Sequence, residues 1–528
     1  MMAPTEVKVI HGRTYLYEIA FTWDKKLHRS RKKTVRYLGR CDARGHLLHP
    51  PRVELEGISS AFPVGTLAVF YAQARELRVA EVAEEVLGLR PPQANLLVAL
   101  ALNQLTGRRA TPHVPDWIRD SPLPRWEVSL PAEIAPRDLE GVLEALCHQT
   151  PNGGYENRGL LLQEGLNRAW RGGSREPSVA FYDVTKQAYS GTTCPLAQVG
   201  YDPERGTGMG VGFGLVISRE HHHPILCRPL PGAKGDTLTV PETVDLLKGM
   251  GYRHLTMVMD RGMVSEENLG RVTGAGFNQV GLVKDWPGKS WAYAGRWSGE
   301  GLQRPEHALP RPGGEAVYGR ALTARLYGRR LRLVLIEDPG RKAEERRARD
   351  MALGEWAGRM TDTRREELTK ELKGLLLPAR GRRGWQVDEK AVAEERARDG
   401  RFLMFSTDES MGAREIFELY FQRVAIEGAF RTAKGELSLG PLKYRRVDRI
   451  EAYATVVYVA YLLWSWAQRK LRKKMPEETM EGALRSLGGV HWLRLGMEKS
   501  VRDWCTRLTD RQEEVLKAFG ARSILPHP

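Results

Sequence analysis

Four polar side chains near the C-terminal end of the chain recur at helical spacing: Tyr420, Arg423, Glu427 and Lys434. Separations of three, four and seven residues return to one face of a helix, so these side chains are expected along one stripe. A carboxylate framed by cations suits a group that holds a metal ion while its neighbours bind phosphate oxygens. The alternative is an ordinary helix surface with stabilising ion pairs.

Two further carboxylates stand at the expected ends of buried strands. Asp183 closes a β-rich run over residues 178–183, and Asp260 follows the apolar run 254–259 and precedes Arg261 and Gly262. A single aspartate at a strand end is more often a turn former or a helix cap than a ligand. Only their combination with Glu427 predicts a metal site made of three carboxylates.

The elements around the two aspartates follow a recognisable order. Strands are predicted over 178–183, 210–218 and 223–230, then a helix over 239–250, a strand over 254–259, a helix over 265–273 and a strand over 278–284. This order resembles the ribonuclease-H-like fold, in which the first and fourth strands lie side by side. Asp183 and Asp260 would then be adjacent, and a helix over 413–437 would bring Glu427 beside them.

The remaining regions complete the predicted organisation, an α/β multidomain protein with a ribonuclease-H-like core. Residues 1–58 form a small basic β-rich module, in which Lys32 and Lys33 are candidate phosphate contacts or else protect a solvated edge strand. Residues 59–172 are predicted as a helical region for DNA binding or dimerisation. The core occupies 173–285 and 401–470, interrupted by a β-containing insertion over 286–400 with a hairpin at Gly328, and a helical region follows over 471–528.

Composition narrows the partners and the compartment. The 528 residues include 81 Lys and Arg against 65 Asp and Glu, a net charge of +16 that favours a polyanionic partner, although an arginine-rich proteome would give the same balance. The five cysteines form no Cys-x2-Cys pair and indicate reduced thiols. The N-terminus lacks the pattern of a signal peptide, and the apolar run 456–466 is shorter than the roughly 20 residues that span a bilayer, so it predicts a buried helix. We therefore expect a cytoplasmic, nucleoid-associated protein with no membrane contact.

Over residues 178–466 the chain resembles a DDE transposase of the insertion-sequence-four family in its broad sense. The resemblance is carried by the segments Phe-Tyr-Asp-Val-Thr at 181–185 and Asp-Arg-Gly at 260–262, and by the spaced signature from Tyr420 to Lys434. It implies that Asp183, Asp260 and Glu427 are the catalytic metal ligands. It also implies that Tyr420, Arg423 and Lys434 contact the transposon-end DNA, and Arg261 is expected to contact DNA beside Asp260.

The resemblance implies a Mg²⁺-dependent enzyme with two ions, for which Mn²⁺ can substitute. Its DNA partners are the terminal inverted repeats of an element and a target duplex, and synapsis of two ends implies a homodimer. Related enzymes stack an extruded base on an aromatic residue of the insertion, so Trp286, Trp291 and Trp297 are candidates, with core packing as the alternative. Two rival functions stay open: an inactive DNA-binding protein with the same fold, and a ribonuclease-H-like nuclease that acts on another DNA substrate.

Overall fold

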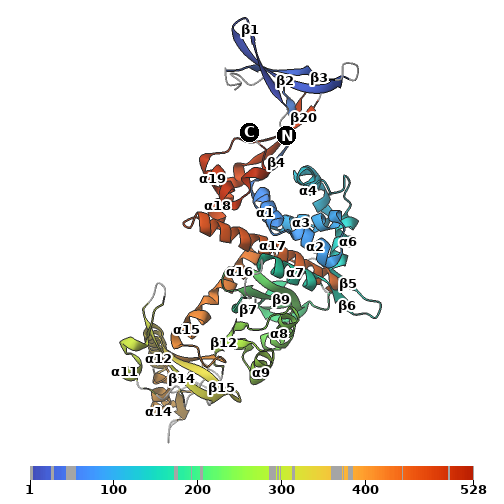
Figure 1. Ribbon diagram of the computed structural model, residues 1–528. Coiled ribbons are helices and arrows are strands. Elements are labelled where there is room, and N and C mark those ends of the chain that lie inside the picture. The colour runs from blue at the N-terminus through green and yellow to red at the C-terminus, as the bar shows by residue number, and fades with distance from the viewer. Residues whose placement is uncertain are drawn as a thin grey trace. The chain divides into compact units, whose positions relative to one another are not determined.

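The computed structural model describes residues 4–24, 29–42, 55–171, 177–191, 193–202, 206–284, 293, 297, 299–311, 315–357, 372, 374–378, 385–442, 444–497 and 500–526 (Figure 1). The chain divides into two compact units. The first comprises residues 1–63, 490–507 and 525–528, and the second comprises residues 64–489 and 508–524.

The first unit consists of two three-stranded antiparallel sheets. Strands β1 (Thr5–Ile10), β2 (Arg13–Asp24) and β3 (Arg29–Arg40) pair in that order, which confirms the β-rich character predicted near the N-terminus. The second sheet joins β4 (Leu55–Pro63) to β19 (His491–Met497) and β20 (Ser500–Cys505). Residues 471–528, predicted as a helical region, therefore contain two strands as well as helices, because β19 pairs with β4 from the other end of the sequence and with β20.

A helical layer opens the second unit. It contains α1 (Gly65–Glu76), α2 (Val79–Leu87), α3 (Pro91–Leu105), α4 (Val114–Asp120), α5 (Leu123–Trp126), α6 (Pro136–Leu146) and α7 (Gly159–Arg171), with a small hairpin of β5 (Cys147–Gln149) and β6 (Tyr155–Asn157). The long helix α17 (Val447–Lys474) packs against α1, α3, α6 and α7, and α18 (Met480–Ser486) and α19 (Asp510–Phe519) follow it.

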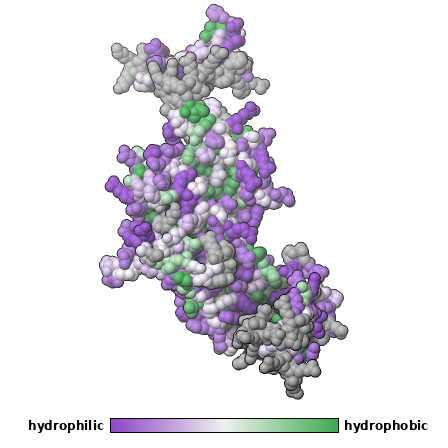
Figure 2. Space-filling view, turned by 180° about the vertical axis from the view of Figure 1, so that it is seen from behind, coloured by the Kyte–Doolittle hydropathy of each residue, from purple (hydrophilic) through white to green (hydrophobic). Residues whose placement is uncertain are grey.

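The apolar run 456–466 lies inside α17 and is almost wholly buried, which confirms the prediction of a buried helix. Within the described parts of the chain, a search for helices of sufficient length and hydropathy to cross a bilayer finds none. On the visible face in Figure 2, hydrophilic side chains predominate and hydrophobic ones form small separate patches.

A large mixed sheet forms the centre of the second unit. Its strands are β7 (Val179–Ala188), β8 (Gln198–Asp202), β9 (Gly206–Ser218), β10 (Pro224–Pro231), β11 (Thr256–Met259), β12 (Asn278–Leu282), β13 (Ala308–Leu309), β14 (Val317–Leu326), β15 (Arg329–Glu337) and β18 (Arg401–Ser406). The spatial order is β10-β9-β7-β11-β12-β18-β15-β14-β13, and β8 pairs with β9. The first and fourth strands of the predicted order correspond to β7 and β11, which are parallel neighbours as predicted.

Two helices cover this part of the sheet. Val240, Val244 and Leu247 of α8 (Val240–Gly249) pack with Tyr182, Met257 and Met259 of the strands in one buried cluster. Helix α9 (Glu266–Gly274) begins after Ser265, whose hydroxyl accepts a hydrogen bond from the Asn268 backbone N–H and so caps the helix. Val272 of α9 belongs to the same buried cluster, so both helices cover one face of the strands that lead to the aspartates.

The strands of the predicted insertion continue the same sheet, because β15 pairs with β18 and β18 pairs with β12. The hairpin predicted at Gly328 is present between β14 and β15. Tyr327 and Gly328 both have positive φ, 51° and 68°, which is the two-residue turn that suits the twist of a hairpin.

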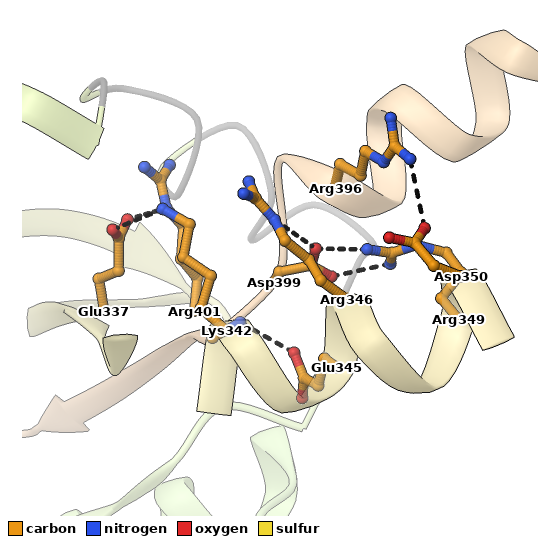
Figure 3. A network of polar contacts seen from close by, with 10 residues as sticks. Glu337, Lys342, Glu345, Arg346, Arg349, Asp350, Arg396, Asp399 and Arg401 are labelled. Atoms are coloured by element: carbon orange, nitrogen blue, oxygen red, sulfur yellow. Dashed lines mark hydrogen bonds and ion pairs between the residues drawn. The ribbon is translucent and has the colours of Figure 1, made fainter. Parts of the chain in front are cut away.

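Helices α11 (Gly299–Leu302), α12 (Pro339–Ala357) and α14 (Glu389–Arg396), with strands β16 (Leu376–Pro378) and β17 (Trp385–Val387), complete this region. Buried ion pairs attach α12 to the sheet (Figure 3). Asp399 accepts hydrogen bonds from Arg349 and Arg346, and Glu337 on β15 pairs with Lys342 at 2.9 Å and with Arg401 at 2.7 Å. This network joins the start of α12 to the strands β15 and β18 that lead back to the core.

Candidate active site

Asp183 and Asp260 lie on adjacent parallel strands. Tyr182 on β7 is paired with Met259 on β11. Asp183 and Asp260 are the residues that directly follow this pair. Asp260 follows the end of β11, as predicted. Asp183 does not end its strand, which is a correction: β7 continues to Ala188 because residues 183–188 stay paired with β9.

Glu427 lies on α16 (Val424–Lys434), which is separated from α15 (Ala413–Gln422) at Arg423. The prediction of one continuous helix over 413–437 was therefore wrong. The Arg423 backbone N–H donates to the Tyr420 carbonyl at 3.1 Å, and the Ile426 N–H donates to the Arg423 carbonyl at 2.9 Å. These bonds span three residues instead of four and tighten the backbone at the junction.

The guanidinium of Arg423 lies among all three carboxylates. Its Nη1 is 3.6 Å from Asp183 Oδ2, and its Nη2 is 3.5 Å from Asp260 Oδ1 and 3.6 Å from Glu427 Oε1. The Tyr420 hydroxyl lies 3.5 Å from Asp260 Oδ1. Residues from two strands and a distant helix pair therefore surround one positive charge.

Burial dominates the electrostatics of this cluster. It raises the pKa of Asp183 to about 6, and the nearby charges of Asp260 and Asp236 add to the rise. The Val184 backbone N–H, which donates to Asp183 Oδ1 at 2.8 Å, and the charge of Arg423 both oppose it. Burial likewise raises the pKa of Tyr420 to about 12, so this phenol keeps its proton at neutral pH.

The ligand types in the cluster suit a hard divalent cation, because Mg²⁺ prefers carboxylate oxygens. Among the described residues, no group of three His, Cys, Asp or Glu side chains is close enough to hold an ion as it stands. Arg423 lies between these three carboxylates, and its Nε is a buried donor that finds no hydrogen-bond partner among the described residues. The carboxylates are therefore of the right type for a divalent cation, and in this structure the guanidinium of Arg423 lies in the position between them.

A turn that the sequence did not single out supports both aspartates. Thr237 Oγ1, in the short helix η2 (Asp236–Thr239), donates to the Gly262 carbonyl at 2.7 Å. Thr239 Oγ1 accepts from the Tyr182 hydroxyl at 2.7 Å, so the same turn contacts β7 beside Asp183 and the loop after Asp260.

Asn268 completes this support, because its Nδ2 donates to the carbonyls of Thr237 and Met263 at 2.9 and 2.8 Å. The same turn begins with Asp236, whose charge reaches Asp183. The only signal in the sequence was a Gly-Asp-Thr segment between two predicted elements, which by itself indicates a turn.

The other predicted DNA contacts lie in different surroundings. Arg261 Nη2 donates to the Lys284 carbonyl at 2.8 Å, and its side chain lines a cavity of about 1080 Å³ shared with Arg349, Arg398 and Leu403. Lys434 is half-buried at the last position of α16, about two turns beyond Glu427.

Lys32 and Lys33 belong to β3 of the first unit, where Lys32 forms an ion pair with Glu6. Of the candidate stacking residues, Trp286 and Trp291 fall outside the described residues. Trp297 is half-buried against the insertion core, and the Arg320 guanidinium lies 4.6 Å from its ring centroid. Core packing therefore accounts for the position of Trp297.

The fold is that of an α/β protein in which helices cover a mixed sheet. Three acids from separate elements lie around one cationic position, and their types suit metal-assisted chemistry on phosphates. The family described as Transposase DDE domain matches residues 192–463, more than half of the chain. The chain belongs to the DDE transposases, and this membership implies cleavage and transesterification of DNA strands. The matched region includes Asp260 and Glu427 and begins after Asp183.

No curated protein matches the sequence. Among solved structures, the chain is similar to a piggyBac transposase in a synaptic complex with hairpin DNA, determined by cryo-EM. The TM-score is 0.39 and the sequence identity is 10%, over 86% of this chain and 79% of that chain.

Proposed function

We propose that the protein is a DDE transposase of the insertion-sequence-four type with a ribonuclease-H-like core. It cuts DNA at the terminal inverted repeats of its element and joins the freed 3′-hydroxyls to target DNA. The observation that carries this proposal is the position of Arg423, whose guanidinium lies within 3.6 Å of Asp183, Asp260 and Glu427.

In this proposal Asp183, Asp260 and Glu427 are the ligands of two Mg²⁺ ions, or of Mn²⁺ in their place. When bound, such ions activate a water or a 3′-hydroxyl and stabilise the leaving oxygen. The chain supplies the geometry: β7 and β11 hold two carboxylates in fixed register, and α16 presents the third. The turn at Thr237 holds the backbone after Asp260 in place.

The cations around the site bind the DNA backbone. Arg423 exchanges its contacts with the carboxylates for a phosphate of the terminal repeat, because a guanidinium forms paired hydrogen bonds with phosphate oxygens. Lys434 and Arg261 contact neighbouring phosphates, and the Tyr420 hydroxyl donates a hydrogen bond to the DNA end. Two copies of the chain hold two ends in the synaptic complex.

The test is strand cleavage and strand transfer with Mg²⁺ on DNA that carries the repeats flanking the gene. Wild type is compared with Asp183→Asn and with Asp245→Asn, which changes an exposed aspartate of α8 paired with Arg271. We expect cleavage and joining by wild type and by Asp245→Asn, and neither by Asp183→Asn. Binding by wild type without cleavage would show an inactive DNA-binding protein, and cleavage without joining would show a nuclease.

A further inference from the structure

Strands β2 and β3 extend beyond β1 as a two-stranded ribbon. The pairing of β1 with β2 runs from Ile10 opposite Arg13 to Thr5 opposite Glu18. Residues 20–24 of β2 pair with residues 29–33 of β3, past the end of the β1 pairing. We call these two segments the ribbon.

One face of the ribbon carries two large exposed aromatic side chains. Phe21 and Trp23 are two residues apart on β2, so they lie on the same face, and they are 59% and 61% exposed. Their cross-strand partners are Lys32 and Ser30. Adjacent exposed aromatics on a narrow hairpin are unusual for a surface without a partner, since such side chains gain most from burial.

Cations lie on both faces of the same ribbon. Strand β3 contains six Lys and Arg residues and no acid: Arg29, Arg31, Lys32, Lys33, Arg36 and Arg40. Lys32 shares a face with Phe21, whereas Arg31 and Lys33 lie opposite Thr22 and Ala20 on the other face.

We propose that the ribbon enters a groove of duplex DNA, with Phe21 and Trp23 against the floor of the groove and the cations directed to its two phosphate walls. The major groove, about 12 Å wide, admits a two-stranded β-ribbon. Lys32 on the aromatic face and Arg31 and Lys33 on the other face have side chains long enough to reach past the strand edges to the phosphates on either side of the groove. A single strand stacked on the aromatic face has only one phosphate backbone and offers contacts to fewer of these cations.

This inference rests on the proposed function in one respect, the identity of DNA as the ligand. It adds a contact surface distant in sequence from the acids, and it gives the two aromatics a role that charge alone does not predict. Affinity then depends on Phe21 and Trp23 as well as on Lys32 and Lys33.

The experiment measures binding of the full chain to a fluorescent duplex by anisotropy over a series of salt concentrations, without divalent ions. The variants are Phe21→Ala with Trp23→Ala, and Lys32→Gln with Lys33→Gln. Two controls match them: Val9→Ala removes an exposed apolar side chain of β1, and Lys517→Gln removes an exposed cation of α19.

We expect the aromatic double variant to bind duplex about tenfold more weakly with an unchanged salt slope, a ratio that corresponds to ~1.4 kcal/mol. The lysine double variant should reduce the slope of log affinity against log salt by about 1.8, because each lost phosphate contact contributes about 0.9. The controls should match wild type.

The proposal would be overturned if the aromatic double variant bound duplex DNA with wild-type affinity, or if it lost affinity only for single-stranded DNA. So would a change from dimer to monomer in light scattering without a change in DNA affinity, because the aromatics would then contact a second copy. The outcome is separate from the catalytic test: if ribbon variants cleave normally at saturating DNA, the proposed function stands whatever their affinity. If the ribbon variants bind DNA more weakly and the wild type does not cleave, the ribbon proposal stands and the catalytic proposal fails.

Discussion

Arg423 and Asp183 form an ion pair between the junction of two helices and the middle of a buried strand, with Nη1 3.6 Å from Oδ2. The same guanidinium contacts Asp260 and Glu427, so one arginine neutralises part of the charge that three carboxylates place together. Three acids at such a distance repel one another unless a cation lies between them. The pairing predicts competition between Arg423 and any divalent ion for the same oxygens.

The first prediction concerns this competition. Arg423→Gln should increase the affinity of the DNA-free protein for Mn²⁺, measured by calorimetry, because the competing charge is gone. The same variant should cleave terminal-repeat DNA about 100-fold more slowly, since a preorganised donor to the reacting phosphate is lost. Arg271→Gln, which removes an exposed arginine, is the control for both measurements. Unchanged Mn²⁺ affinity would show that Arg423 does not compete with metal.

The second prediction concerns pH. The pKa of Asp183 in the folded protein is about 6, above its ordinary value of 3.8, mainly because of burial. The folded state therefore binds the proton more tightly than the unfolded state, and Asp183 lowers the free energy of unfolding as pH rises from about 4 to about 6. Asp183→Asn cannot ionise, so in chelator it should be more stable than wild type at pH 8 by an amount on the order of 2 kcal/mol.

Thermal unfolding at pH 4 and pH 8 checks this sign. The advantage of Asp183→Asn should be present at pH 8 and absent at pH 4, where the wild-type carboxyl is largely protonated. Asp245→Asn, at an exposed site, should show no such dependence. Equal melting temperatures of Asp183→Asn and wild type at pH 8 would contradict the burial of a charged Asp183.

The convergence of Asp183 and Asp260 could be predicted because the order of elements around them resembles the ribonuclease-H-like fold, in which the first and fourth strands are neighbours. Two short apolar runs, each followed by an acid, become adjacent parallel strands when the intervening strands and helix have the right order. Glu427 followed from the spacing of Tyr420 and Arg423, since helical periodicity survives a tight junction.

Other features depend on partners that are remote in sequence. Nothing near Arg423 signals a helix junction, because neither proline nor glycine lies between Ile416 and Ile426. The extension of β7 beyond Asp183 follows from its pairing with β9, and β19 forms a strand because β4 from the opposite end of the chain pairs with it. Such pairings are not encoded in local periodicity.

The third prediction tests the attachment of α12 with two ion pairs of different burial (Figure 3). Asp399 and Arg349 are 3% and 10% exposed, whereas Asp350 and Arg396 are 54% and 52% exposed. Arg349→Met leaves a buried carboxylate with less compensation and should lower the free energy of unfolding by about 3 kcal/mol. Arg396→Met should change it by less than about 1 kcal/mol.

Urea denaturation of the two variants gives the comparison. The double variant Arg349→Met with Asp399→Leu replaces both charged partners by apolar side chains. It should recover part of the lost stability, because no buried charge is then left without a partner. Equal effects of Arg349→Met and Arg396→Met would mean that burial of the Arg349–Asp399 pair does not matter.

The last prediction concerns Thr237 as a positioning residue. Its hydroxyl donates to the Gly262 carbonyl at 2.7 Å and holds the backbone that follows Asp260. Thr237→Val keeps the shape of the side chain and removes this donor, which leaves the carbonyl unsatisfied at a net loss of ~1 kcal/mol. We expect a higher Mg²⁺ concentration for half-maximal cleavage and unchanged affinity for terminal-repeat DNA, because Asp260 is less well held while the DNA contacts remain. Thr237→Ser retains the hydroxyl and should restore the wild-type Mg²⁺ requirement. If Thr237→Val and Thr237→Ser behave alike, the hydrogen bond does not position Asp260, and the turn serves packing alone.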